Sequence, residues 1–185
     1  KNYDLKWRGP GQLRYALANS INMSAVKMVA LDGVSDMLAL SYDMGLSTLE
    51  ATKENLARFG LSVTLGGGEV HLLELAQAYG VFATGGLHQD SVAILKVTDK
   101  DGKVLFDYKT SSGKRVLSAE VSYLITNILS DNSARSLVFG ERSALNIPGK
   151  TTFVKTGTTD DKRDNWTVGG TKSRIIGVWV GNKDN

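Results

Sequence analysis

The sequence contains no cysteine and only two histidines among its 185 residues. Without cysteine, neither a disulfide framework nor a cysteine-ligated metal site can form, and a cysteine-free chain suits an extracytoplasmic location. His71 and His88 lie far apart in the sequence, which disfavours a histidine-rich metal site, so we interpret both as surface or packing residues. No apolar run approaches the roughly 18 residues that a membrane-spanning helix needs.

An excess of one charge sign is also lacking. The chain has 22 Lys and Arg against 19 Asp and Glu, a net charge of +3, and no basic run exceeds two residues. This mixture predicts a solvated surface and disfavours nucleic-acid binding. The first residues, Lys1-Asn2-Tyr3-Asp4, include no initiator methionine and have no signal-peptide character, so we expect the chain to be a piece of a longer protein.

The first half of the chain is predicted to be helical. Apolar residues recur there at helical spacing, most clearly between Val70 and Ala83. Pro10 is expected at the first position of the first helix, and Ser24 is expected to cap the second. The expected helices cover residues 11–18, 24–31, 35–43, 48–59 and 70–83.

The second half is predicted to be mainly β. A hairpin is expected from Val92–Val97 and Val104–Tyr108, joined at Asp101-Gly102, a favoured turn pair. One more helix is expected over residues 118–129, capped by Ser118. Further strands are expected at residues 153–154, 166–168 and 175–180. We therefore predict an α+β fold for residues 1–185, with a mainly helical part at 1–90 and a mainly β part at 91–185.

Three polar stretches carry little functional signal. Gly66-Gly67-Gly68 lacks the spacing of a phosphate-binding loop and is interpreted as a turn. Residues 144–151 match a nucleotide-binding loop loosely, but a β-favouring run follows where such a loop needs a helix. The acidic group Asp160, Asp161 and Asp164 is interpreted as a solvated turn that could bind a cation only weakly.

The stretch Asn19–Lys27 contains two serines that are both candidates for chemistry. Ser24 and Lys27 are three residues apart, so one helical turn would bring hydroxyl and amine together. Ser20 and Asn22 are two residues apart, a spacing that suits a bend directing both side chains into a cleft. The spacing alone does not decide between the serines.

A second candidate is the stretch Lys155-Thr156-Gly157-Thr158-Thr159, which continues a predicted strand. It offers an ammonium, several hydroxyls and exposed amides along one sheet edge, a suitable cradle for a carboxylate beside a carbonyl that becomes an oxyanion. Gly157 leaves room for close approach to the backbone. The alternative is an edge strand protected from aggregation by lysine and threonine.

Taken together, these motifs and their flanks resemble the transpeptidase domain of class A penicillin-binding proteins. The resemblance rests on Ser20-x-Asn22, on Lys155-Thr156-Gly157 and on stretches that cover nearly the whole chain. These are NYDLKWRGPGQLRYALANSINMSAVKMVAL, LGGGEVHLLELAQAYGVFATGG, VKTGTTDDKRDNWTVGGT and IIGVWVGN. It implies the fold shared with serine β-lactamases, in which a helical subdomain joins an antiparallel sheet flanked by helices.

The resemblance also implies roles for residues. Ser20 would relay a proton to the leaving nitrogen, Asn22 would hold the substrate amide, and Lys155 would supply positive potential and stay charged unless strongly buried. Substrate binding would fall to Thr156, Gly157, Thr158 and Thr159: the two hydroxyls of Thr156 and Thr158 would bind the terminal carboxylate, and the Thr158 amide would form half of an oxyanion hole. The implied partners are a peptidoglycan stem peptide ending in D-Ala-D-Ala and β-lactams, with no metal or organic cofactor.

In this pattern Ser24–Lys27 is coincidental, because the Ser-x-x-Lys nucleophile lies upstream of the second motif. The resemblance implies that the nucleophile and its neighbouring strands lie outside this chain, so that residues 1–185 alone are inactive. The sheet should then expose apolar surface unless the missing upstream part, or another copy, covers it. A β-lactamase, a D,D-carboxypeptidase and a non-catalytic sensor remain alternatives. All of these interpretations require the Ser20 bend and the Lys155 strand to face each other.

Overall fold

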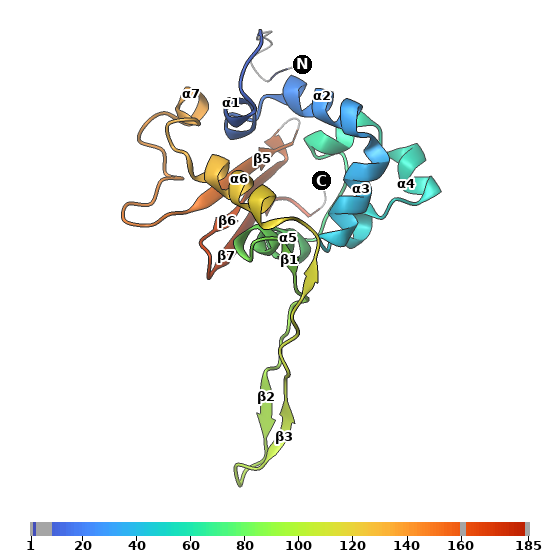
Figure 1. The fold of residues 1–185 in the computed structure, drawn as a ribbon, viewed down its shortest axis with the longest axis vertical. Coiled ribbons are helices and arrows are strands. Elements are labelled where there is room, and N and C mark those ends of the chain that lie inside the picture. The colour runs from blue at the N-terminus through green and yellow to red at the C-terminus, as the bar shows by residue number, and fades with distance from the viewer. Residues whose placement is uncertain (1, 3–8, 160–161, 184–185) are drawn as a thin grey trace.

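The computed structural model describes residue 2, residues 9–159 and residues 162–183. Helices dominate its first half and an antiparallel sheet closes the chain (Figure 1). The first-half elements are α1 (Leu13–Ala18), α2 (Asn22–Asp32), α3 (Val34–Asp43), η1 (Ser47–Leu49), α4 (Lys53–Arg58), η2 (Leu61–Leu65), α5 (Leu72–Ala83) and β1 (Leu87–His88). The remaining elements are β2 (Lys96–Thr98), β3 (Val104–Asp107), β4 (Lys114–Arg115), α6 (Ala119–Ser130), α7 (Ser136–Phe139), β5 (Phe153–Thr158), β6 (Asp164–Gly170) and β7 (Ile175–Gly181).

The helical part encloses a compact apolar core. Leu38 of α3 is fully buried, and Phe59 and Ala78 are nearly so. The buried members of this cluster are Leu38, Leu46, Leu49, Phe59, Val63 and Ala78. Because they come from α3, α5 and the segments between, their burial holds these elements as one unit.

The sheet has the order β5-β6-β7, with antiparallel pairing throughout. Helices α5 and α6 pack against it (Figure 1). At Gly177 of β7, an added Cβ would lie 3.0 Å from Leu72 Cδ1 of α5, so glycine permits the close approach of helix and strand. Tyr79 of α5 stacks on Phe153 of β5, with ring centroids 6.5 Å apart.

The predicted fold class is confirmed, and so are several local details. The hairpin forms around a turn in which Gly102 has a φ of +84°. Ser118 caps α6 by accepting a hydrogen bond from the Val121 amide at 3.2 Å. A strand follows residues 144–151, as expected. His71 is exposed, and His88 packs against Gly45, which confirms their interpretation as surface and packing residues.

Three predictions about helix ends were wrong. Helix α1 begins at Leu13, so Pro10 lies before the helix and not at its first position. Helix α2 begins at Asn22 with Ile21 as its N-cap, because the bend at Ser20 ends two residues before; Ser24 is inside the helix and caps nothing. The single helix expected over 48–59 is divided into η1 and α4, since Thr52 accepts a hydrogen bond from the Asn55 amide and starts a new helix there.

The β2–β3 hairpin projects from the body as an arm (Figure 1). Its register places Val97 opposite Phe106 and Lys96 opposite Asp107. Val97, Val104 and Phe106 therefore share one face of the arm, and Lys96, Asp107 and the exposed Leu105 share the other.

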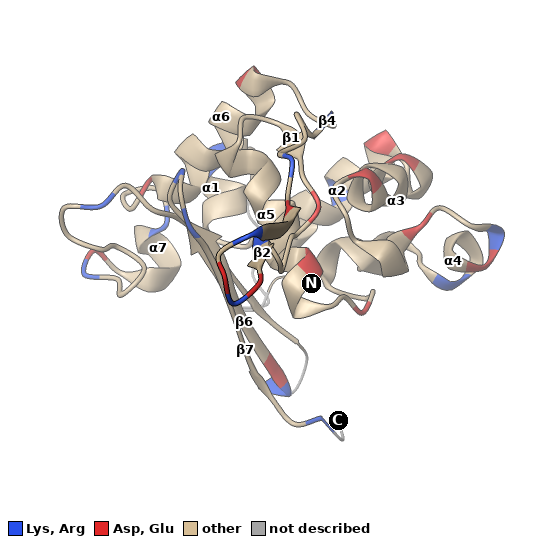
Figure 2. Cartoon of the chain, turned by 90° about the horizontal axis from the view of Figure 1, so that it is seen from below, with Lys and Arg blue, Asp and Glu red and all other residues tan. Residues whose placement is uncertain are grey.

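Charges of both signs are interspersed over the chain (Figure 2), as the composition predicts. Among the described residues, no helix is both long and apolar enough to cross a bilayer.

Candidate active site

Ser20 and Lys155, which are 135 positions apart, meet in the structure. The Lys155 Nζ donates a hydrogen bond to the Ser20 Oγ and a second one, of 2.8 Å, to the carbonyl oxygen of Thr156. Ser20 stands in the bend between α1 and α2, and Lys155 is on β5. The bend and the strand thus face each other, as the motifs require.

The bend has an unusual backbone conformation at Ser20. Its φ is +54°, in the left-handed region that non-glycine residues seldom adopt. The Ser20 amide donates to the Leu17 carbonyl and the Ile21 amide to the Ala16 carbonyl, which closes the end of α1. This turn leaves Ser20 exposed and aims its hydroxyl at β5.

Burial changes the acid–base chemistry of Lys155. Desolvation lowers the pKa of its amine from 10.5 to about 8, because removing water disfavours the charged form. The expectation was that Lys155 stays charged unless strongly buried, and its burial lowers the pKa of the amine toward neutrality. Near neutral pH the amine is mostly protonated and can donate to Ser20, but it is within reach of deprotonation.

Strand β5 has a free edge beside this pair. It pairs only with β6 among the described strands. The Thr159 amide donates to the Asp164 carbonyl, and antiparallel strands alternate between bonded and non-bonded pairs. Because of this alternation, the backbone groups of Thr156 and Thr158 point toward the free edge. The Thr156 carbonyl oxygen agrees with this, since it accepts a hydrogen bond from the Lys155 amine. The Thr158 amide is thus available to an incoming oxygen.

Gly157 keeps this edge open. A Cβ added at this position would meet only the Trp166 Cβ, at an ordinary 3.6 Å. The chain's own packing therefore does not demand glycine. A missing side chain here leaves space beside the strand for another molecule.

The end of β5 is held by Asp164, the first residue of β6. Its carboxylate accepts hydrogen bonds from the Thr159 hydroxyl, at 3.1 Å, and from the Trp179 Nε1, at 2.8 Å. Asp164 is therefore a half-buried structural residue, and its interpretation as part of a solvated turn is wrong. Asp160 and Asp161 lie outside the described residues.

The remaining predicted positions lie close to this pair in the chain. Asn22 is the first residue of α2 and is half-buried. Thr156, Gly157 and Thr158 follow Lys155 along β5, and Thr159 comes directly after the strand.

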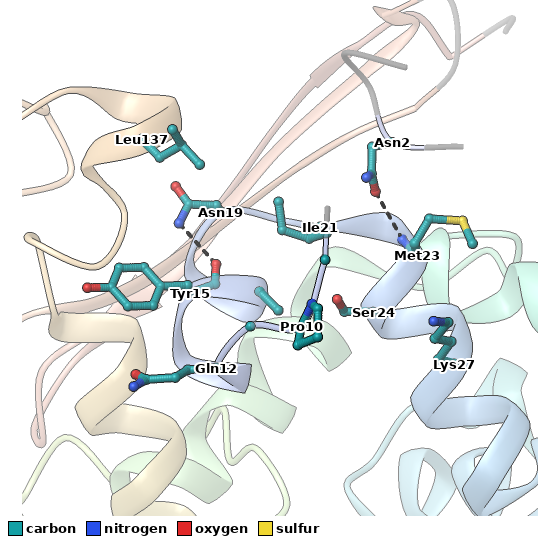
Figure 3. Close-up of a pocket in the computed structure, with 13 residues that line it drawn as sticks. Asn2, Pro10, Gln12, Tyr15, Asn19, Ile21, Met23, Ser24, Lys27 and Leu137 are labelled. Carbon is teal, nitrogen blue, oxygen red and sulfur yellow. Dashed lines mark hydrogen bonds between the residues drawn. The ribbon is translucent and has the colours of Figure 1, made fainter. Parts of the chain in front are cut away.

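Ser24 and Lys27 have different surroundings. Both line a cavity of about 270 Å³ bounded by α1 and α2 and by Leu137 of α7 (Figure 3). Within the described part of the chain, no hydrogen bond joins the Ser24 hydroxyl to the Lys27 amine, and Lys27 is exposed. Spacing by one helical turn therefore does not make this serine and lysine a working pair.

Sequence reasoning missed two residues that shape the site, Asn19 and Asp164. Asn19 is 3% exposed, and its side chain bonds to segments more than 100 positions away. An asparagine beside a bend gives no sign of such partners in the sequence. A carboxylate at the start of a tryptophan-containing strand, such as Asp164, gives only a weak sign of its partners.

Known proteins are similar to this chain over nearly its whole length. No protein-family model matches the chain. Penicillin-binding protein 1A of Aquifex aeolicus is 35% identical over 182 residues, which are 98% of this chain and 23% of that protein. The chain belongs to the class A penicillin-binding proteins. It spans about one fifth of the length of the curated relatives it matches.

Solved structures support the fold of this penicillin-binding protein chain. PonA1 of Mycobacterium tuberculosis superposes with a TM-score of 0.81 at 24% identity, over 97% of this chain and 50% of that one. PonA1 has also been solved in complex with penicillin V. The D,D-transpeptidase domain of a peptidoglycan glycosyltransferase from Eggerthella lenta gives a TM-score of 0.76 at 17% identity, over 100% and 51% of the two chains. These likenesses show that the fold is that of penicillin-binding transpeptidase domains.

Proposed function

We propose that this chain carries the second and third motifs of a peptidoglycan D,D-transpeptidase, which cross-links stem peptides through an acyl-serine intermediate. The observation that carries the proposal is the hydrogen bond from Lys155 to Ser20. It joins two motifs from distant parts of the chain beside a free strand edge. A merely protective lysine on an edge strand would point into solvent.

The acylation step assigns each group a task. A serine hydroxyl from an upstream Ser-x-x-Lys segment attacks the carbonyl carbon of the penultimate D-alanine, and the bond from that carbon to the terminal D-alanine nitrogen breaks. Because Lys155 donates to the Ser20 oxygen, the Ser20 hydroxyl proton is free to move to the departing nitrogen, and the proton lost by the attacking serine passes to the Ser20 oxygen in its place. Asn22 holds the substrate amide.

The edge of β5 stabilises the charges of the substrate. The hydroxyls of Thr156 and Thr158 bind its terminal carboxylate, near the Lys155 ammonium. The Thr158 amide donates to the oxyanion that forms during attack, and the nucleophile's own amide donates the second bond. One such donor contributes roughly 3 kcal/mol of barrier lowering in enzymes generally. The Thr159 hydroxyl donates to the Asp164 carboxylate across the end of the hairpin and so fixes the position of the Thr158 amide.

Deacylation completes the reaction. An amine from a neighbouring stem attacks the acyl-serine ester, gives up a proton and forms the cross-link, which restores the serine hydroxyl. A β-lactam imitates the substrate and leaves the serine acylated. The parent protein is extracytoplasmic, anchored by a segment outside this chain, and residues 1–185 alone lack the nucleophile.

Labelling with a fluorescent penicillin tests the proposal. We expect the full-length protein that contains this chain to be labelled covalently at an upstream serine, and residues 1–185 alone to remain unlabelled. Ser20→Ala should slow labelling of the full-length protein by about 10²-fold, the usual scale of proton-transfer catalysis. Ser24→Ala is the matched control and should label at the normal rate.

Peptide mapping of the label gives the decisive readout. A label on Ser24, or normal labelling of the Ser20→Ala variant, would overturn the proposed roles. Absence of label on the full-length protein would favour a non-catalytic sensor. Rapid hydrolysis of the acyl-enzyme would favour a β-lactamase.

A further inference from the structure

Asn19 immediately precedes Ser20 but faces the opposite way. Ser20 is exposed and hydrogen-bonded to Lys155, whereas Asn19 is 3% exposed. The Asn19 Nδ2 donates to the Tyr15 carbonyl at 3.0 Å (Figure 3) and to the Ala134 carbonyl at 2.7 Å. Its Oδ1 accepts from the Val138 amide at 3.2 Å. Both amide protons and the oxygen are thus engaged with backbone groups.

Two of these three bonds connect the bend to the α6–α7 region, which contains neither motif. Tyr15 belongs to α1, Val138 to α7, and Ala134 to the turn between α6 and α7. Arg14 supports the same junction, since it donates to the Asp131 carboxylate at 3.0 Å and to the Asn127 Oδ1 at 2.6 Å. Helix α1 and the bend that follows it are therefore fixed to the end of α6 and to the turn after it.

Ser20 needs such support because of its backbone. A non-glycine residue at φ +54° is in a sparsely populated region, which is unfavourable and persists only where the surrounding structure enforces it. Among the described residues, Ser20 itself makes an amide bond to the end of α1 and a side-chain bond to Lys155. The side chain of its neighbour Asn19 makes three hydrogen bonds to backbone groups, one of them buried and two part-buried.

We propose that Asn19 is a positioning residue, which holds the left-handed turn so that the Ser20 hydroxyl points at Lys155. This inference rests on the proposed function, because it assigns Asn19 an effect on acylation that acts through Ser20. A simpler role for Asn19 is to stabilise the junction of α1 with α6 and α7, without effect on the chemistry.

The chain offers a matched control for that simpler role. Asn55 also donates through its Nδ2 to two backbone carbonyls, Thr48 at 3.2 Å and Glu50 at 2.7 Å. It is half-buried in α4, at the far side of the helical part from α1 (Figure 1). Asn19→Ala and Asn55→Ala remove the same kind of contact, but only the first removes it beside Ser20.

The test measures the rate of acylation of the full-length protein by a fluorescent penicillin, alongside thermal melting. We expect Asn19→Ala to slow acylation by tenfold or more, since displacements of about 1 Å can cost up to 10²-fold. Asn55→Ala should lower the melting temperature and leave acylation within about twofold. Ser20→Ala combined with Asn19→Ala should be hardly slower than Ser20→Ala alone, because residues that act through one group are not additive.

Several outcomes would overturn the inference. Normal acylation by a folded Asn19→Ala variant would do so. So would an equal fold-loss of acylation rate when Asn19→Ala is introduced into the unsubstituted protein and into the Ser20→Ala variant. If Asn19→Ala does not fold, Asn19→Asp replaces it; this variant keeps the size and the acceptor but loses both amide donors, and it should also slow acylation. Failure of the proposed function looks different, because the unsubstituted protein would then take no label at all.

Discussion

At the scale of single residues, the proposed chemistry depends on the ionisation of Lys155. Its pKa of about 8 is low because the amine is desolvated. The protonated amine makes a charge-assisted hydrogen bond to Ser20, and its positive charge is present below about pH 8 and is lost as the pH rises through that value. Stability changes in the opposite direction. The unfolded chain keeps a pKa near 10.5 and binds the proton more tightly than the folded chain between the two values, so this group makes the protein more stable as the pH rises from 8 to 10.5.

Because the charge on Lys155 falls while the free energy of unfolding rises over the same pH range, a loss of activity can be distinguished from a loss of folding. We expect penicillin acylation of the full-length protein to fall above about pH 8 although the folded state is not lost, as checked by circular dichroism at each pH. Lys155→Arg should acylate more slowly at neutral pH but lose the Lys155 step of the profile, because a guanidinium stays protonated. A step of unchanged size in this variant would assign the ionisation to another group.

At the scale of elements, the end of the β5–β6 hairpin sets the position of the Thr158 amide. The Asp164 carboxylate joins Thr159 at the end of β5 to Trp179 on β7. Three strands are thereby fixed by one side chain at the site where an oxyanion would be bound.

Removal of this carboxylate has a definite expected cost. Asp164→Ala leaves the Trp179 Nε1 without this acceptor and should destabilise the full-length protein by about 1–3 kcal/mol in urea denaturation. It should also slow acylation, because the hairpin end loosens. Asp164→Asn keeps an oxygen for Trp179 and should recover most of the stability. Equal losses in both variants would show that the negative charge matters and the hydrogen-bond acceptor does not.

Local signals in the sequence predicted most elements but not their junctions. Ser118 was identifiable as a cap because its partner, the Val121 amide, is three residues away. Ser24 has the same chemistry, yet the turn at Ser20 started the helix at Asn22 and made a cap at Ser24 impossible. Asn19 was not identifiable at all, since its partners at Ala134 and Val138 come near only in the folded chain. Pairing Ser20 with Lys155 before folding was possible only through the family resemblance.

At the scale of the whole molecule, one face of the sheet exposes a row of apolar side chains. Ile176, Val178 and Val180 alternate along β7 and point to the same side of the sheet. They are 64%, 47% and 62% exposed, which confirms the expected apolar surface. Strand β7 is also an edge among the described strands, so its outer backbone groups are open to pairing. The opposite face of the sheet is packed against α5 and α6.

An exposed apolar row beside an open edge favours association, and we propose that the upstream part of the same domain covers it in the full-length protein. Val178→Lys then has opposite effects in two settings. It should reduce self-association of residues 1–185, as measured by light scattering, because it places a charge in the apolar row. In the full-length protein it should cost on the order of several kcal/mol of unfolding free energy, because the ammonium is buried without a partner.

Ser112→Lys adds the same charge to an exposed loop away from β7 and serves as the control. It should change neither quantity by much. If residues 1–185 are monomeric and melt cooperatively without any substitution, the apolar row needs no cover. If Val178→Lys leaves the full-length protein as stable as before, the row remains in solvent there as well, and the upstream segment packs elsewhere.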